Sequence, residues 1–263
     1  MSHRSFVRAV ALGAAGATAL FAAPAAFAAS APAAAGQVSA AMAAHETHGL
    51  QSLSHRSATT VESSNWSGYA ATGSTGEFTS VSSSWVQPAL TCTSKTTYSS
   101  YWVGLDGYSN SALEQTGTEA DCISGKAVYG AWWEVLPAAE TAYSVTVKAG
   151  DSLSASVKDN GNGTFTMTLT DSTEGWTKTT THAGSSGYQD SSAEVIAEAT
   201  EVNGSIAKLS DFGTVTFTNA TADGSALANY SPNEIIMAGN TDIKAQPGGI
   251  SGGTFSDTWE NYS

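Results

Sequence analysis

Apolar and polar residues alternate along much of the chain after Val61. In SLSASV (152–157) and again in TFTMTLT (164–170), every second residue is apolar and the residues between are Ser or Thr. A period of two is typical of a β-strand with one buried face, because successive side chains point to opposite sides. DNGNG (159–163), which lies between the two segments, is a turn signal. The pattern therefore predicts a β-hairpin.

Further strands are predicted by the same alternation. YSVTV (143–147) and GTVTFTNAT (213–221) repeat it, and NEIIMAG (233–239) has the composition of a more buried strand. The run SSAEVIAEATEV (191–202) stays open between two interpretations, since its Ala and Glu content favours a helix whereas its alternation fits a strand. Many short strands without crossover helices indicate an all-β fold, an antiparallel β-sandwich.

The first residues have the pattern of a secretory signal peptide, over 1–28. Arg4 and Arg8 precede a short apolar run (10–20), and Ala-Phe-Ala (26–28) fits a cleavage site. A membrane anchor is the rival interpretation. It is disfavoured because the run is short for a bilayer and Pro24 follows it. We therefore expect a secreted, extracellular protein without a membrane partner after signal cleavage.

Residues 29–60 are rich in Ala and Ser and contain no Phe, Tyr or Trp. Such a segment cannot bury enough apolar surface to fold alone. We interpret it as a propeptide or linker, which leaves 61–263 as one folded domain of about 200 residues. The propeptide carries His45, His48, His55 and Arg56, which we expect to dock on the acidic domain near neutral pH and to be released in acid, when the carboxylates become protonated.

The segment 61–263 is strongly acidic. It contains 22 Asp and Glu residues, seven Lys and no Arg, a formal balance of −15. Nucleic acid is therefore excluded as a partner, because phosphate binding needs Lys and Arg. An acidic surface with few cations suits a protein that works in acid, although ordinary solubility would give the same composition. No feature indicates an obligate partner, so we expect a monomer.

Cys92 and Cys122 are the only cysteines. In a secreted protein an isolated pair predicts one disulfide, worth about 3–4 kcal/mol in the chain-entropy model. A catalytic thiol or a Ser-His-Asp triad would need His182, the single His after Val61, which lies in the polar segment KTTTHAGSSG that we expect to be a loop. We find no zinc, EF-hand or phosphate-loop motif, so we predict no metal and no cofactor.

Carboxylates and amides beside aromatic residues remain as candidates. They gather in WVGLDGYSNSALEQTG (102–117), GAWWEVLP (130–137) and AEVIAEA (193–199). Each has an ordinary interpretation, since a Trp in a strand is usually part of the core and a Glu on a strand usually faces solvent. Composition alone supports only a secreted acidic β-sandwich.

Five motifs in order resemble the glutamic peptidases, family G1 or eqolisins. They are TTVESSNWSGYAATG, WVGLDG, LEQTG, AWWEVLP and AEVIAEA, and they extend from about Thr59 through most of the folded part. The resemblance implies a concanavalin-like sandwich of two antiparallel sheets with about seven strands each. It also implies an acid endopeptidase that acts on polypeptides and is secreted as a zymogen.

The resemblance assigns roles to six residues. The catalytic pair corresponds to Gln115 and Glu198. Residues that line the substrate cleft in that family correspond to Trp102, Asp106, Trp132 and Glu134.

The pair fits the chemistry of peptide hydrolysis in acid. Glu198 would take a proton from water and return it to the leaving amine, since a Glu, which ordinarily titrates near pH 4.3, can hold either protonation state in mild acid. Gln115 would stabilise the oxyanion with a donor that stays neutral at every pH. Two carbohydrate-active alternatives stay open, a glycoside hydrolase that uses Glu134 and Glu198 and a non-catalytic glycan-binding module.

Overall fold

The computed structural model describes residues 45–50 and 52–263. The predicted signal peptide, and the predicted propeptide as far as residue 44, lie outside these residues. Within the described part, strands dominate and the single helical element is a short 3₁₀ turn, η1 (Leu227–Tyr230). No helix in these ranges has the length and the apolar character that crossing a bilayer requires.

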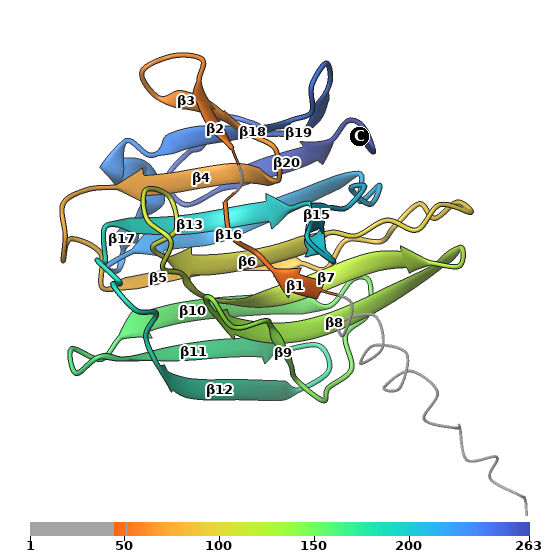
Figure 1. Cartoon of the computed structure of the whole chain (residues 1–263). Helices are drawn as coiled ribbons and strands as arrows, with labels where there is room; N and C mark the ends of the chain where they lie inside the picture. Colours follow the sequence, from red (N-terminus) through yellow and green to blue (C-terminus); the bar gives the residue numbers. More distant parts are fainter. Residues whose placement is uncertain (1–44, 51) are drawn as a thin grey trace, which may run out of the picture. The chain divides into compact units, whose positions relative to one another are not determined.

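The strands of the described chain form two layers, and the first contains the predicted hairpin (Figure 1). From one edge inward its strands are β12 (Trp176–Ala183), β11 (Thr164–Asp171), β10 (Ser152–Asp159), β5 (Ser80–Val86), β16 (Thr214–Ala222), β20 (Phe255–Trp259) and β19 (Ile243–Pro247). All of these neighbours are antiparallel. Short strand β17 (Ser225–Ala226) extends β16 at its end.

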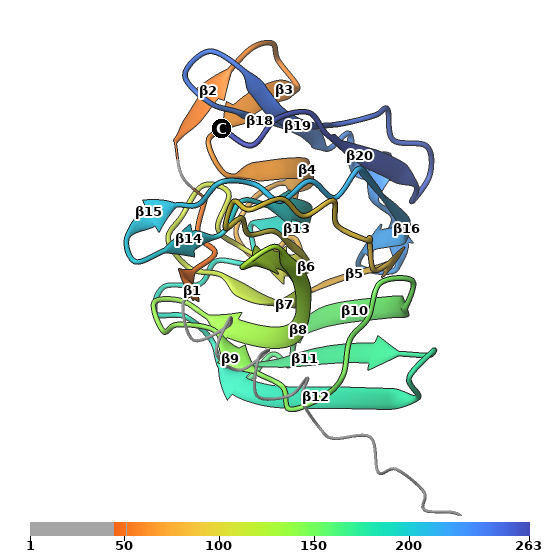
Figure 2. The same ribbon diagram turned by 90° about the vertical axis from the view of Figure 1, so that its right-hand side faces the viewer.

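The second layer carries the candidate site. Its strands are, in order, β9 (Thr141–Ala142), β8 (Lys126–Val135), β7 (Glu114–Ile123), β6 (Ser100–Leu105), β13 (Ser192–Glu198) and β4 (Trp66–Thr72). Strand β18 (Asn233–Ala238) pairs with both β4 and β19 and joins the two layers. Figure 2 shows the curved course of β8 in this layer. The predicted antiparallel β-sandwich is confirmed.

The period-two pattern gives the second layer two different faces. Tyr101, Val103 and Leu105 of β6 belong to the large apolar core between the layers. Trp102, the residue between the first two, belongs to a separate apolar cluster on the other face, together with Trp132. Alternate residues of the same strands therefore build the core and the floor of the candidate site.

The strand predictions have two corrections. YSVTV (143–147) is not a strand. The ladder with β8 consists of Thr141–Ala142, followed by one further hydrogen bond from Tyr143 N–H to the Ala131 carbonyl at 2.8 Å. The chain then bends, with Val145 N–H donating to the Tyr143 carbonyl at 2.9 Å. Its alternation reflects side-chain packing, because Val147 is buried without a ladder partner. The second correction is His182, which lies in strand β12 rather than in a loop, although its side chain is exposed. The ambiguous run Ser191–Val202 is a strand, β13, over most of its length.

The segment before Val61 is partly paired with the sandwich. Strand β1 (His45–Thr47) pairs with β14 (Glu201–Val202), which pairs in turn with β15 (Ser205–Ile206). Strand β2 (Leu53–His55) pairs with β3 (Thr60–Ser63), and β3 lies parallel to β18. The predicted boundary at residues 60 and 61 thus falls within β3, and the cleavage site stays a prediction.

The predicted disulfide is confirmed. Cys92 and Cys122 are bonded, with their Cα atoms 5.5 Å apart. Cys122 lies on β7 and exchanges backbone hydrogen bonds with Thr97. The bond therefore ties the long connection between β5 and β6 to the strand that carries Gln115.

Buried carboxyl groups make the fold sensitive to high pH. Asp257 on β20 accepts a hydrogen bond from Ser67 Oγ of β4 at 3.0 Å and is fully buried between the layers. Burial raises the pKa of Asp257 to about 8 and the pKa of Glu114 to about 8 as well. Each native pKa lies above its unfolded value, so each group stabilises the fold below about pH 4, and that stabilisation is lost as the pH rises towards 8.

We expect Asp257→Asn to flatten this dependence. Relative to wild type, its free energy of unfolding should change little near pH 4 and should be higher near pH 8. The wild type loses up to about 1.4 kcal/mol per pH unit through this group. Urea unfolding at both pH values measures the effect, with the exposed Asp242→Asn as the matched control. Equal slopes for wild type and Asp257→Asn would contradict the assignment.

Candidate active site

Four strands bring the candidate residues to one face of the second layer. Trp102 comes from β6, Gln115 from β7, Glu134 from β8 and Glu198 from β13. Gln115 and Glu134 are direct cross-strand partners. The side chains of all four are fully buried. Residues up to 96 positions apart in sequence therefore meet on one surface, because their side chains all point to the same face of the sheet.

Glu198 is a buried carboxylate held by donors on both oxygens. Its Oε1 accepts from Asn65 Nδ2 at 2.9 Å, and its Oε2 accepts from Trp102 Nε1 at 2.8 Å. Burial raises the pKa of Glu198 above its usual value, while His48, Trp102 and Asn65 oppose that rise. The Glu198 carboxyl therefore takes up a proton more readily than an exposed Glu does.

Gln115 lies beside a second acid. Its Nε2 donates to Glu134 Oε2 at 2.6 Å. Burial raises the pKa of Glu134 to about 8, with smaller increases from Glu140 and Glu198. Glu134 is therefore mainly protonated in acid, so Gln115 and Glu134 form a neutral amide–carboxylic acid pair next to Glu198.

His48, from the segment before Val61, occupies the space between these groups. Its Nδ1 lies 3.0 Å from Glu198 Oε2, and its backbone N–H donates to Glu134 Oε2 at 3.3 Å. The imidazole stacks on the indole of Trp132, with ring centroids 4.1 Å apart and planes 2° apart. His48 is fully buried. The N-terminal segment thus fills the candidate site.

Two glycines make room for Trp102 on the floor of the site. A Cβ on Gly117 of β7 would meet the Trp102 Cβ at 2.5 Å, and a Cβ on Gly104 of β6 would lie 3.0 Å from its ring. The first contact is closer than any real Cβ atom makes, and the second would force the ring to shift. The glycines of LEQTG and WVGLDG therefore let the indole take the position from which it reaches Glu198.

Asp106 acts at a different place. It accepts from the backbone N–H groups of Gln189, Asp190 and Ser191 at 2.7–3.0 Å and from Asn110 Nδ2 at 2.8 Å. Asp106 itself has a left-handed backbone, with φ of 68°. Its carboxylate organises the turn that leads into β13, the strand of Glu198. Its described hydrogen bonds do not reach His48 or Glu198.

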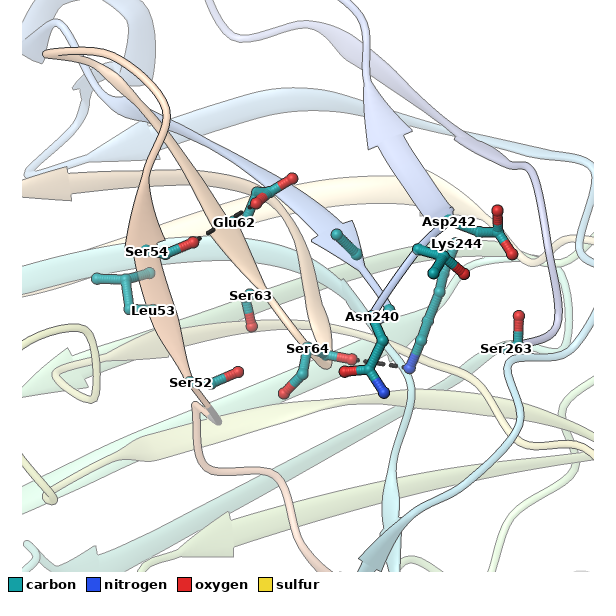
Figure 3. Close-up of a pocket in the computed structure, with 13 residues that line it drawn as sticks. Ser52, Leu53, Ser54, Glu62, Ser63, Ser64, Asn240, Asp242, Lys244 and Ser263 are labelled. Atoms are coloured by element: carbon teal, nitrogen blue, oxygen red, sulfur yellow. Dashed lines mark hydrogen bonds between the residues drawn. The ribbon is translucent and has the colours of Figure 1, made fainter.

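Two open pockets lie on either side of the short N-terminal strand β2. One of about 510 Å³ is lined by Leu50, Tyr108 and Leu136 among others. The other, of about 520 Å³, is polar, and Figure 3 shows Lys244 in it donating to the Ser64 carbonyl, at 3.0 Å. Neither is lined by Gln115, Glu134 or Glu198. His48 occupies the space beside Glu198.

Sequence reasoning missed two residues of this cluster. Asn65 lies within the first of the five motifs, in SSNWSG, and Glu140 follows the AWWEVLP motif. Glu140 Oε2 is 2.8 Å from His48 Nε2. Asn65 has a signal in the sequence, because a buried carboxylate needs donors and an amide next to a Trp of the motif offers one. Nothing in the sequence indicates that Glu140 turns back onto the site.

The comparisons with known proteins identify the family of this chain. The profile of the Peptidase A4 family matches residues 64–254, so the chain belongs to that family, the glutamic peptidases. Aspergillopepsin-2 of Aspergillus niger is 35% identical over 127 residues, which cover 47% of this chain and 45% of that protein. The match therefore spans less than half of the relative's length.

Solved structures show the same fold. Scytalido-glutamic peptidase, described with a transition state analog inhibitor, superposes with a TM-score of 0.65 at 27% identity, over 75% of this chain and 98% of that one. Aspergilloglutamic peptidase from Aspergillus niger gives a TM-score of 0.57 at 28% identity, over 62% and 99% of the two chains. The family resemblance seen in the five motifs is confirmed.

The hydrogen bond from Trp102 to Glu198 can be tested by removing the indole N–H. We expect Trp102→Phe to raise the pKa of Glu198, because a hydrogen bond to the charged form favours that form. The carboxyl ¹³C signal of Glu198, assigned by its loss in Glu198→Gln, measures the shift. Trp85→Phe is the control, since Trp85 Nε1 donates to Thr118 and belongs to the core between the layers. A Glu198 pKa that is unchanged in Trp102→Phe would contradict the contact.

Proposed function

We propose that the protein is an acid endopeptidase in which Glu198 and Gln115 perform the catalysis. The observation that supports this most strongly is the state of Glu198. It is a fully buried carboxyl with a raised pKa, it is fixed by Asn65 and Trp102, and it shares a site with a neutral amide. Such a group can remove and return a proton in mild acid, where a His would be protonated and could not act as a base.

Glu198 acts on a water molecule that enters when His48 leaves. It takes a proton from the water as the oxygen attacks the peptide carbonyl carbon. It then donates that proton to the leaving nitrogen as the C–N bond breaks. Asn65 and Trp102 keep the carboxyl group in one orientation through both steps. Both donors are neutral, so neither gains or loses charge as the pH changes.

Gln115 stabilises the oxyanion of the tetrahedral intermediate. Its amide nitrogen carries two hydrogens, and one of them is used by Glu134. The second is available to the developing oxyanion. Glu134 fixes the amide so that it does not have to reorganise during the reaction, which is the condition under which such donors are effective.

Polypeptides are the proposed substrates, and the protein is proposed to be secreted as a zymogen. A similar structure, at 27% identity and a TM-score of 0.61, is described in complex with the tripeptide Ala-Ile-His. In the present chain a peptide segment already lies on Glu134, Trp66 and Asn65 through its backbone. A cleft that binds backbone groups in this way suits an extended peptide.

We expect Glu198→Gln to abolish cleavage of a denatured protein at about pH 3.5, below the ordinary Glu pKa. Gln115→Ala should retain the fold and reduce turnover by about 10²–10³, the usual loss for one oxyanion donor. His182→Ala is the control, because its exposed side chain lies on β12 at the edge of the other layer.

Full activity in Glu198→Gln would overturn the assignment of the base. Loss of activity in His182→Ala would instead favour a triad. If none of the chains cleaves peptides but the wild type hydrolyses or binds glycans, the carbohydrate-active alternative is correct.

A further inference from the structure

We propose that Glu198, Glu140 and Trp132 form a binding site for an imidazolium ring, and that His48 fills this site to keep the full chain inactive. The proposal rests on the proposed function, since it assigns an inhibitor to the same catalytic carboxylate. The site would bind a flat cation with two N–H donors. In the intact chain this ligand is the side chain of His48.

The contacts fit an imidazolium on every side. The ring lies between two carboxylates, with Nδ1 3.0 Å from Glu198 Oε2 and Nε2 2.8 Å from Glu140 Oε2. One flat face covers the indole of Trp132 in a parallel stack. A Lys has a single charged nitrogen and no flat face, so it could not satisfy both carboxylates and the indole together. The side chains of His48 and of both Glu residues are at most 1% exposed.

The ring is held in its charged form. Burial alone would lower the pKa of His48, but the charge of Glu198 and the hydrogen bonds to Glu140 and Glu198 raise it well above the usual value. Glu134 on β8 and the Ser100 hydroxyl on β6 also face the ring, the latter 3.3 Å from Nδ1. The ring keeps its charge until the pH rises through its raised pKa, whereas in acid the protonation of Glu198, whose pKa burial also raises, removes the attraction and releases the ring.

The segment is placed as an inhibitor rather than as a substrate. The group that contacts Glu198 is a side chain, whereas the backbone of the segment is held by Glu134, Trp66 and Asn65. The His48 carbonyl accepts from Trp66 Nε1 at 3.1 Å, and the Gly49 carbonyl accepts from Asn65 Nδ2 at 3.0 Å. Both carbonyls are thus held by neutral donors of the cleft, while the imidazole is the group that contacts Glu198. The imidazole also occupies the place beside Glu198 Oε2 where an attacking water would bind.

Pairing on both sides keeps the ring in position. Before His48, strand β1 is paired with β14, and after it, strand β2 is paired with β3. Arg56, at the end of this segment, donates to Glu62 of β3 at 2.5 Å. Because the flanking strands are fixed, the ring binds as an intramolecular ligand at a high effective concentration.

Replacing the ring tests the proposal in the full chain. We expect His48→Gly to cleave a neutral peptide at least about tenfold faster than wild type at about pH 5.5, between the ordinary pKa values of Glu and His. Free imidazole added to His48→Gly should restore the inhibition, whereas it should not affect the wild type. His55→Gly is the matched control, because His55 lies in the same segment with an exposed side chain. It should behave as wild type.

A second substitution identifies the partner of the ring. In the His48→Gly background, Glu140→Gln should weaken imidazole binding by about tenfold or more, as expected for loss of one hydrogen bond to a charged group. Calorimetry measures this binding without any catalysis, so it decides the proposal even if no chain cleaves peptides and the proposed function fails. Absence of imidazole binding to His48→Gly would overturn the site.

Wild-type protein supplies a measurement that does not depend on how the variants fold. Both ring N–H protons of His48 should be visible by NMR at neutral pH, because the ring is charged and buried. A His48 that titrates at its ordinary value, or a His48→Gly chain as slow as wild type and indifferent to imidazole, would overturn the proposal.

Discussion

The buried carboxylate of Glu198 is the constraint on which the rest of the site depends. A charge without partners in a dry interior costs several kcal/mol, so the protein must supply donors or neutralise it. Here an amide from just before β4, an indole from β6 and an imidazole from the N-terminal segment all converge on two oxygens. Each comes from a different part of the chain. The buried charge is therefore stabilised only when all three segments are assembled around it.

The sandwich makes this convergence possible through the parity of its strands. One set of residues on β4, β6 and β13 packs against the first layer, and the alternate set faces the site. The core thus fixes the positions of the proposed catalytic side chains, because the strands that carry them cannot shift relative to one another. Asp106 adds to this by binding the turn that precedes β13. The alternation of side chains along these strands therefore supplies both the core that stabilises the fold and the geometry of the site.

Much of this could be predicted from the sequence, and the remainder has a physical explanation. Period two predicted the hairpin of β10 and β11, and the motifs placed Trp102, Gln115, Glu134 and Glu198 together. The same rule failed at YSVTV (143–147), because a coil with one packed side shows the same alternation as a strand. It also gave no indication of Glu140 or of the position of His48 beside Glu198. Those contacts depend on how a loop and a distant segment return to the sheet, which local pattern does not encode.

The few basic residues of the chain are concentrated partly in the segment before Val61. In a domain with 22 acids and seven lysines after Val61, the histidines and Arg56 of the preceding segment are a large share of the available cations. One of them, His48, lies between Glu198 and Glu140 in the candidate site. Carboxylates of this acidic domain therefore hold its N-terminal segment.

The central claim is that Glu198 and Gln115 together hold the oxygen of the reacting centre. A crystal structure of the His48→Gly chain with a peptide that carries a tetrahedral hydroxyl in place of the scissile carbonyl tests this most directly. The account predicts that this hydroxyl lies within hydrogen-bond distance of both Glu198 and Gln115 Nε2. A hydroxyl bound elsewhere, with Glu198 still occupied only by Asn65 and Trp102, would contradict it.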